Sequence, residues 1–477
     1  MVNLVVKLTR QLPPPVGLGI VLLFGLGTGR PASARAQQTR TAGVDDSLRV
    51  ERVVARVTGT YPTIEAARRE VDAAAARVGQ ARSGYWPRVS AVASYRRRDP
   101  VPEVTIPGGR AGPGGGGSGR SVAIQPNNLY DGHLRVRQTL YDFGKTSARI
   151  DRAEAGRATA RRQVGVERTE LAFRAVEAFY TTLLAGARLD VQRDQINQLE
   201  RTLKVVRRRK RAGTATAFEV RSTRTRLSAA RSQRTQFRSQ LNRQEAELRR
   251  LLGRAPDAAL SRRLSGTIRP TLNPADTARI DADSLAERAL RRHPLVRAAQ
   301  ARVEAARRQV RVADRSDAPI LALDARGGVK NGYPGEPNEP RLNESIGVSL
   351  TVPVFEGFAA KRQEEEAQAR LQATEARLTD VRRTVSTGVR QAASTLRARL
   401  DRLASTRLRV EQARTAARLA RTRYEAGTIT NLELLGAETA LREARLERTE
   451  VRYQVVLGRY ALQRAAGTLL PLDASSL

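Results

Sequence analysis

The sequence contains no cysteine, and it has only two histidines, one methionine and one tryptophan in 477 residues. The absence of cysteine excludes a disulfide framework, a thiolate metal site and an N-terminal cysteine that could carry a lipid anchor. Neither His133 nor His293 lies near a plausible partner, so we expect each to be a surface or core residue. Because no nucleophilic or metal-binding pattern occurs either, the sequence predicts no metal site, no cofactor and no enzymatic activity.

Lysine is also scarce, because 79 of the 85 basic residues are arginine. The formal net charge of +37 and the pI near 11.5 would ordinarily suggest nucleic acid as a partner. The arginines, however, are interleaved with acidic residues along helical patterns, which is typical of solvated helix faces. No basic patch interleaved with aromatic residues, zinc-ligand spacing or phosphate-binding loop is present, since the run Gly114 to Gly119 lacks a following Lys-Ser/Thr. We therefore expect no nucleic-acid partner.

Long apolar runs are missing as well. The longest, Val16 to Gly27, is shorter than the roughly 20 residues that a membrane-spanning helix needs. It follows the basic residues Lys7 and Arg10 and precedes the small-residue pattern Ala34-Arg35-Ala36. This order is typical of a cleaved secretory signal, here residues 1–36, and a short membrane anchor is the weaker alternative. The mature chain is therefore expected to be exported.

The chain contains an internal duplication. The stretch from Arg423 to Leu434 matches the stretch from Arg209 to Val220 at an offset of 214 residues, and this offset holds without a gap from Leu140 to Gly253. Upstream the offset becomes 232, which places an insertion in the Gly/Pro-rich run Pro100 to Pro126, where a loop is expected. The sequence thus predicts a first structural repeat at 37–253, a linker or equatorial segment at 254–283, a second repeat at 284–470 and a tail at 471–477.

Each repeat contains a very long helical pattern. No proline occurs from Gly144 to Ala212 or from Gly357 to Ala426, and at 1.5 Å per residue each stretch would reach roughly 100 Å as a helix. After each stretch a second pattern runs back with apolar residues at a spacing of seven, which is typical of coiled-coil packing. The apolar positions are Val220, Leu227, Leu241 and Leu248 in the first repeat and Leu434, Leu441, Val455 and Leu462 in the second, with Arg234 and Arg448 as the interruptions. Shorter elements precede them: a weakly structured lead-in at residues 37–58 and a helix from Thr63 to Arg82.

Two strands are expected in each repeat. Apolar residues alternate with small or polar ones from Val89 to Tyr95 and from Leu134 to Leu140, and again from Leu321 to Ala325 and from Ile346 to Val354. Four such strands fit the wall of an outer-membrane barrel, but barrels begin at about eight strands, so several copies must combine theirs. The predicted fold is mainly α with a small β part: long antiparallel coiled-coil helices form an α-barrel, and four strands per chain contribute to a shared transmembrane β-barrel. A soluble sheet with one wet face is the alternative.

This order of elements resembles the TolC-like outer-membrane efflux protein family over residues 60 to 470. The more specific marks are the strand-to-helix junctions Leu140-Tyr141-Asp142-Phe143-Gly144 and Val354-Phe355-Glu356-Gly357, and above all Tyr424-Glu425-Ala426-Gly427-Thr428 leading to Leu432-Glu433-Leu434. The resemblance implies a homotrimer in the cell outer membrane that extends into the periplasm. Three chains would form a twelve-stranded barrel that contacts outer-membrane lipid and continues into a periplasmic helical tunnel. A periplasmic adaptor protein and an inner-membrane transporter would be its partners, and it would be a passive exit duct for small molecules or proteins in a tripartite efflux or type I secretion-like system.

The resemblance also implies roles for individual residues. The turns would be the adaptor-docking tips: Ala212, Gly213 and Thr214 in the first repeat, and Ala426, Gly427 and Thr428 in the second. The gate or constriction would comprise Glu433, in an acidic ring, together with Glu219 and Tyr424. The pattern departs from the family at Ile429, where a gate arginine can occur, and at Gly436, where a second acidic ring can occur. Because Glu219 and Glu433 each lie in the first turns of a helix, where an acid complements the helix dipole, a capping role is an open alternative for both.

Two other functions fit parts of the sequence. An exported or cytoplasmic arginine-rich coiled-coil protein could bind acidic polymers, and it would form no stable oligomer in detergent. A periplasmic adaptor of the same export machines also has a helical hairpin. Duplication of the hairpin together with four amphipathic strands argues against the adaptor.

Overall fold

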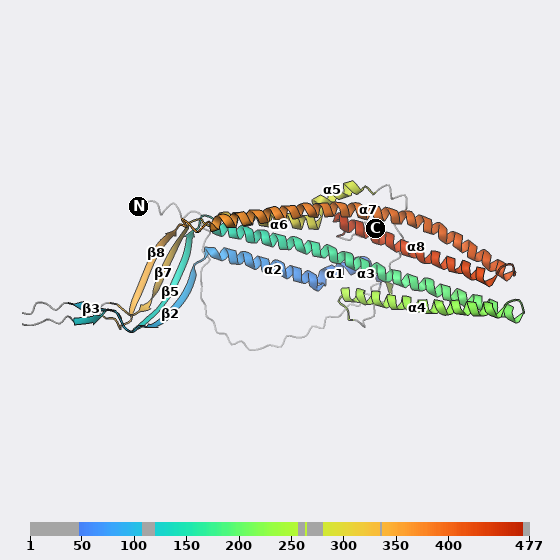
Figure 1. Ribbon diagram of the computed structural model, residues 1–477, viewed down its shortest axis with the longest axis horizontal. Coiled ribbons are helices and arrows are strands. Elements are labelled where there is room, and N and C mark those ends of the chain that lie inside the picture. The colour runs from blue at the N-terminus through green and yellow to red at the C-terminus, as the bar shows by residue number, and fades with distance from the viewer. Residues whose placement is uncertain (1–46, 107–119, 256–262, 265–279, 334–335, 471–477) are drawn as a thin grey trace, which may run out of the picture. The chain divides into compact units, whose positions relative to one another are not determined.

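The computed structural model describes residues 47–106, 120–255, 263–264, 280–333 and 336–470. The predicted signal, the run Gly114 to Gly119, the predicted tail and most of the predicted linker lie outside the described residues. The described part contains long helices and a four-stranded antiparallel sheet, which confirms the predicted fold class (Figure 1).

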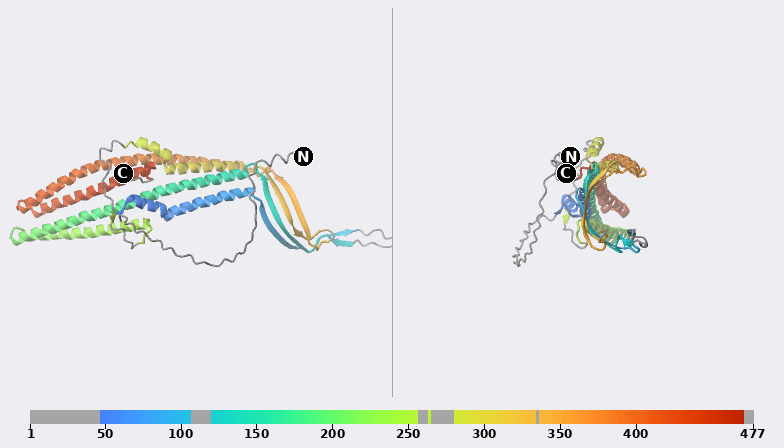
Figure 2. Two further views of the ribbon diagram at one scale, coloured as in Figure 1. Left: turned by 180° about the vertical axis from the view of Figure 1, so that it is seen from behind. Right: turned by 90° about the vertical axis from the view of Figure 1, so that its left-hand side faces the viewer.

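The sheet combines two strands from each predicted repeat. Its order is β2-β5-β7-β8, with bounds β2 (Arg88–Arg97), β5 (Asn128–Tyr141), β7 (Ile320–Lys330) and β8 (Arg341–Thr351). All neighbours are antiparallel, and β2 and β8 are the two edges. The sheet is visibly curved in both views of Figure 2.

The strand register brings the apolar residues onto one face. Val89 lies opposite Val136, Val136 opposite Ala325, and Ala325 opposite Ile346, so these four residues form an apolar row across the sheet. These side chains are not covered, since Ile346 is 78% and Val348 61% exposed. Alternate residues, many of them arginine, lie on the opposite face because successive side chains of a strand point to opposite sides.

Two details of the β part differ from the prediction. The last strand, β8, ends at Thr351, and the predicted continuation through Val352 to Val354 is wrong; Pro353 has no backbone N–H to donate to a ladder. The predicted loop from Pro100 to Pro126 contains a short antiparallel ribbon, β3 (Glu103–Ile106) paired with β4 (Arg120–Ala123). The β-branched run within β3 favours a strand, but the glycine and proline content of the segment concealed it.

Two antiparallel helix pairs form most of the structure. The outgoing helices α3 (Lys145–Arg211) and α7 (Ala359–Glu425) each have 67 residues, and α4 (Ala217–Leu251) and α8 (Asn431–Ala466) return along them. The pair α3/α4 contacts the pair α7/α8 mainly through α3 and α8. Both turns lie at the end of the helices away from the sheet (Figure 1). The heptad residues Val220, Leu227, Leu248, Leu434 and Val455 are buried, and Leu241, Leu441 and Leu462 are half-buried.

Shorter helices extend this layer. The helices α2 (Pro62–Arg82) and α6 (Pro294–Asp314) each start with proline in the first turn, a position that tolerates its missing N–H. The first packs on α3, and the second packs on both α3 and α7. A 3-10 turn (Ser83–Tyr85) leads from α2 to β2, and α5 (Ala282–Arg292) packs on α7.

The segment before α2 is a helix, so the predicted weakly structured lead-in is wrong over its second half. Helix α1 (Val50–Thr60) buries Val50, Val53, Val54 and Val57 in one apolar cluster with Phe179 of α3 and residues of α4 and α8. The spacing of these valines is the helical period of one face, but six β-branched residues in eleven obscured it. Before it, β1 (Ser47–Leu48) pairs in parallel with β6 (Arg263–Leu264).

His293 lies at the start of α6 and is buried, as one of the two roles expected for it. Its Nδ1 accepts a hydrogen bond from the Leu295 N–H at 3.1 Å, and its Nε2 lies 3.2 Å from the Arg464 carbonyl oxygen, where an N–H would donate. Burial lowers the pKa of His293, so the neutral ring is the folded form. Gly467, at φ +71°, packs on this residue, since an added Cβ would lie 2.9 Å from the His293 Cα.

We predict that the protein loses stability on the acid side of neutrality because His293 is held neutral. Its pKa in the unfolded chain is about 6.5 and its folded pKa is lower, so the stabilisation is complete above about pH 6.5 and is lost as the pH falls towards the folded value. Melting temperatures measured from pH 8 to pH 5 should show a loss that is smaller in His293→Asn, which can still accept the Leu295 N–H. An equal loss in both proteins would contradict this assignment.

Candidate functional site at the helical turns

The two helical turns have the same backbone structure. In each, a glycine with positive φ ends the outgoing helix: Gly213 at +77° and Gly427 at +80°. The following threonine, Thr214 or Thr428, donates its N–H and its hydroxyl to the carbonyl oxygen five residues earlier, at 2.9 to 3.1 Å. Glycine is needed there because a left-handed conformation strains other residues. The duplicated Ala-Gly-Thr sequence is therefore a duplicated helix stop.

Each returning helix starts with a threonine cap. Thr216 and Thr430 accept the N–H of the residue three positions on, Glu219 at 3.2 Å and Glu433 at 3.3 Å. In return, the Glu219 carboxylate accepts a hydrogen bond from the Thr216 N–H, which completes a capping box. The Glu433 carboxylate accepts from the Thr430 hydroxyl at 3.2 Å, and Glu433 is exposed. Both acids thus stabilise a helix start, whatever further role they have.

Tyr424 connects the two helix pairs. Its hydroxyl donates to Glu219 Oε2 at 2.8 Å, so the last turn of α7 is bonded to the first turn of α4. Only 3% of Tyr424 is exposed, and burial, together with this hydrogen bond to Glu219, raises the pKa of the Tyr424 hydroxyl. The phenol therefore remains protonated, and it remains a donor, throughout the physiological pH range.

Arg209 holds Tyr424 from the other side. Its guanidinium carbon lies 4.7 Å from the centre of the tyrosine ring, and Nη1 donates to the Tyr424 carbonyl oxygen. The cation therefore adds a ring contact and a backbone bond to the hydroxyl bond with Glu219. We call Arg209, Glu219 and Tyr424 the inter-pair lock, since α3, α4 and α7 each contribute one residue.

Asn431 extends the same contact to α8. It is buried, and its Nδ2 donates to Thr223 Oγ1 at 3.0 Å and to the Glu219 carbonyl oxygen at 3.3 Å. Apolar residues of both pairs surround these polar groups, including Val206, Leu203 and Leu434. Hydrogen bonds in such surroundings are costly to break, because the separated groups remain partly shielded from water.

The structure joins two of the three predicted gate residues. Tyr424 and Glu219 are bonded to each other, whereas Glu433 contacts neither within the chain and lies at its own helix start. Ile429, where the family pattern can have arginine, packs against the apolar cluster. The guanidinium at this site comes instead from Arg209, which sequence reasoning missed. The internal duplication aligns Arg209 with Arg423, and this drew attention to Arg209. It gave no sign that Arg209 contacts Tyr424.

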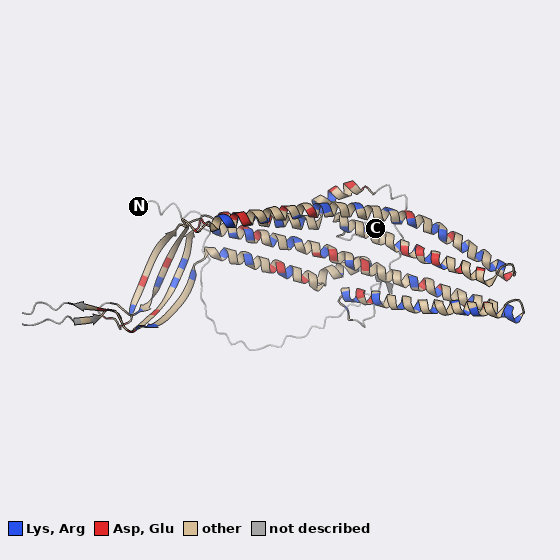
Figure 3. Ribbon diagram, in the orientation of Figure 1, with Lys and Arg blue, Asp and Glu red and all other residues tan. Residues whose placement is uncertain are grey.

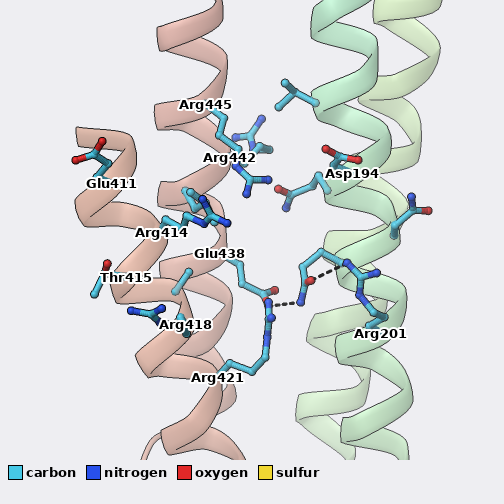
Figure 4. Close-up of a pocket in the computed structure, with 16 residues that line it drawn as sticks. Asp194, Arg201, Glu411, Arg414, Thr415, Arg418, Arg421, Glu438, Arg442 and Arg445 are labelled. Carbon is cyan, nitrogen blue, oxygen red and sulfur yellow. Dashed lines mark hydrogen bonds and ion pairs between the residues drawn. The ribbon is translucent and has the colours of Figure 1, made fainter. Parts of the chain in front are cut away.

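A groove lies beside the lock, between α3 on one side and α7 and α8 on the other. Its volume is about 700 Å³, and Figure 4 shows most of its arginines on α7 and α8, with Asp194 and Arg201 on α3. Glu438 forms its base: the residue is 5% exposed and accepts from Gln198 Nε2 at 2.8 Å, Thr202 Oγ1 at 3.2 Å and Arg421 Nη2 at 3.4 Å. Sequence reasoning missed this residue too. Its side-chain bonds hold α3 against α8 further from the turns.

The described residues offer no metal site, since they contain no group of three or more His, Asp or Glu placed to hold an ion. Among the same residues no helix is both long and apolar enough to cross a membrane. The contacts that the site contains are hydrogen bonds and ion pairs between helices.

The sequence matches the profile of a family described as "Outer membrane efflux protein" over residues 53–254 and 285–468. It is similar to the protein CyaE of Bordetella pertussis, at 29% identity over 395 residues, covering 80% of each chain. It is also similar to the alkaline protease secretion protein AprF of Pseudomonas aeruginosa, at 26% identity over 349 residues, covering 72% of this chain and 71% of the relative. A crystal structure of a membrane protein from Pseudomonas aeruginosa has the same fold, with a TM-score of 0.71 at 21% identity, covering 88% of this chain and 93% of that one.

Proposed function

This chain belongs to the outer membrane efflux protein family, and we propose that three copies of it assemble into one export channel. As a family member it is an outer-membrane channel, an exit duct that extends into the periplasm. The family consists of channel proteins, and we propose that this chain likewise has no catalytic activity. Because the family match spans both repeats, neither the arginine-rich polymer binder nor the periplasmic adaptor is retained.

The sheet supports the trimer. Its apolar face is exposed and its edges, β2 and β8, lack partners within the described chain. A sheet in lipid must have no free edge, so β2 of one copy would pair with β8 of the next. Three copies would give twelve strands, an even number within the range known for outer-membrane barrels. The exposed apolar face would then contact lipid, and the helices would form the periplasmic duct.

We also propose a periplasmic adaptor and an inner-membrane transporter as partners. The name of AprF describes protease secretion, which supports proteins as one class of cargo, with small molecules as another. The tips Ala212, Gly213 and Thr214, together with Ala426, Gly427 and Thr428, would contact the adaptor, because both turns lie at the free end of the helix pairs (Figure 1). The division into a signal at 1–36, repeats at 37–253 and 284–470 and a linker at 254–283 stays a prediction.

For the gate we propose that the inter-pair lock keeps the resting duct narrow. Tyr424 and Glu219 would hold the α7 turn against the first pair, and Arg209 would supply the cation that is lacking at Ile429. Glu433 is exposed at the start of α8, where a three-fold axis could bring three carboxylates together.

Val348→Arg should prevent trimer formation. An arginine on the lipid face costs about 2–4 kcal/mol near the bilayer midplane, whereas its neighbour Ser349 lies on the opposite face. Native mass measurement of detergent extracts should show a trimer for wild type and for Ser349→Arg, but not for Val348→Arg. Equal assembly of both variants would mean that the lipid face is wrongly assigned.

Replacing Gly213 and Gly427 together by tryptophan should abolish adaptor binding while the trimer persists. An added Cβ at Gly213 meets no atom within 4 Å, so the indole would project from the tip and block a partner. The matched control is the double alanine variant, which has the same backbone strain at positive φ but little bulk. Recovery of the adaptor with the tagged channel is the measurement. Undiminished recovery with the tryptophan variant would rule out docking at the tips.

Tyr424→Phe should raise the conductance of the resting channel in a planar bilayer, because it removes the hydroxyl bond to Glu219 and leaves the aromatic ring in place. Unchanged conductance in Tyr424→Phe would show that the lock is no gate.

Glu433→Gln separately tests the proposed ring of three carboxylates. Three facing carboxylates attract cations, so this change should weaken cation preference and block by trivalent cations. For Glu433→Gln, a helix-start role alone predicts only a stability loss of about 0.3–1 kcal/mol.

A further inference from the structure

The face of the sheet opposite the apolar one is strongly basic. Two adjacent levels of the sheet contain four arginines: Arg88 lies opposite Arg137 on β5, and Arg135 lies opposite Arg326 on β7. One acid, Asp324, lies among them. We call these four arginines the arginine belt. Farther along the same face lie Arg96, Lys330 and Arg341, against a single further acid, Asp131.

The belt is only partly neutralised. Asp324 Oδ1 accepts from Arg135 Nη2 at 3.0 Å, and Asp324 Oδ2 lies 3.7 Å from Arg137 Nε. Arg88 and Arg326 are exposed and have no carboxylate partner among the described residues. The apolar face, by contrast, has charged residues only at Arg97, in the last position of β2, and at Glu344.

This arrangement opposes the stability of the sheet. Residues directly opposite on neighbouring strands have Cβ atoms about 4.5–5.5 Å apart, and like charges in such pairs destabilise the sheet. Two arginine pairs at adjacent levels therefore break a local rule of strand pairing. Such unfavourable pairs are expected at functional positions, where the side chains serve an activity of the protein and not its stability. The relevant function here is the contact of this face with the contents of the duct.

We propose that the arginine belt makes the barrel lumen selective for solutes with net negative charge. The proposal rests on the proposed trimer, in which the face opposite the lipid lines the lumen. The rotation axis would repeat the belt in each copy and form a closed basic band. A cleft lined by one sign of charge raises the local concentration of the opposite ion by about 10- to 1000-fold. The band lies where β2 begins and β5 ends, so cargo leaving the helical duct meets it first.

The test is the reversal potential of single channels under a KCl gradient. Glu433 and the belt would act in series with opposite preference, so the measurements use the Glu433→Gln background. There the chloride-to-potassium permeability ratio should exceed one. It should fall several-fold in Arg88→Gln/Arg326→Gln and invert in Arg88→Glu/Arg326→Glu. The glutamine pair should fold normally, since it removes only repulsion.

The matched control is Arg97→Gln against Arg88→Gln, because both remove one arginine from β2 but on opposite faces. Only Arg88→Gln should change the ratio. Block of the current by polyglutamate or polylysine then shows which charged chains enter the lumen. Block by polyglutamate that disappears in Arg88→Gln/Arg326→Gln extends the favoured solutes to acidic polypeptides. The absence of block by polyglutamate restricts the favoured solutes to small anions. Block by polylysine, or a ratio that the belt variants leave unchanged in a conducting channel, overturns the proposal. A parent protein that does not conduct even after Tyr424→Phe is added to release the proposed lock overturns the proposed channel itself.

Discussion

The unpaired sheet is the constraint on which the rest of the structure depends. Four strands with an exposed apolar face and two open edges cannot persist alone in water or in lipid, since both the face and the edge need partners. In the proposed trimer, closure by rotation would satisfy both at once, and it would also determine the symmetry of the helices. Because α3 starts four residues after β5 and α7 eight residues after β8, the symmetry of the strands would be transmitted directly to the helices.

The same constraint explains the arginine-rich composition. Helices that form a wall have water on two sides, so only narrow stripes can be apolar, and the buried residues of α3 include many small ones such as Ala172, Ala175 and Ala185. The remaining surface must be charged or polar, and Figure 3 shows basic and acidic residues interspersed along α3, α7 and α8. Arginine serves well there because its aliphatic stem covers apolar surface while the guanidinium stays hydrated. Wall-like architecture thus explains why so much of the helix surface is charged.

Periodicity predicted the large elements and failed on local ones. The apolar pattern of a long strand or helix recurs over many residues. A single sequence was therefore enough to predict the strands around Val89 and Val348 and the helices after Gly144 and Gly357. Helix α1 was missed because its valines favour strands locally, and β3 because glycine and proline dominate its surroundings. The contact of Arg209 with Tyr424 spans 215 residues and depends on how two helix pairs meet, which no local pattern encodes. Glu438 was missed for the same reason, since a glutamate on a helix is ordinarily solvated.

The contacts between the two helix pairs form a series, and this determines what separating the two turns would require. From the turns inwards, Tyr424 bonds Glu219, Asn431 bonds Thr223, Arg226 bonds Thr439, and Gln198 bonds the buried Glu438. Separating the turns would break these bonds in that order, and each further step would expose a polar group that was satisfied before. In the isolated chain the arrangement with the turns held together is therefore the more stable one. On the proposed docking at the tips, a partner could shift this balance only by binding the separated state more tightly than the joined one.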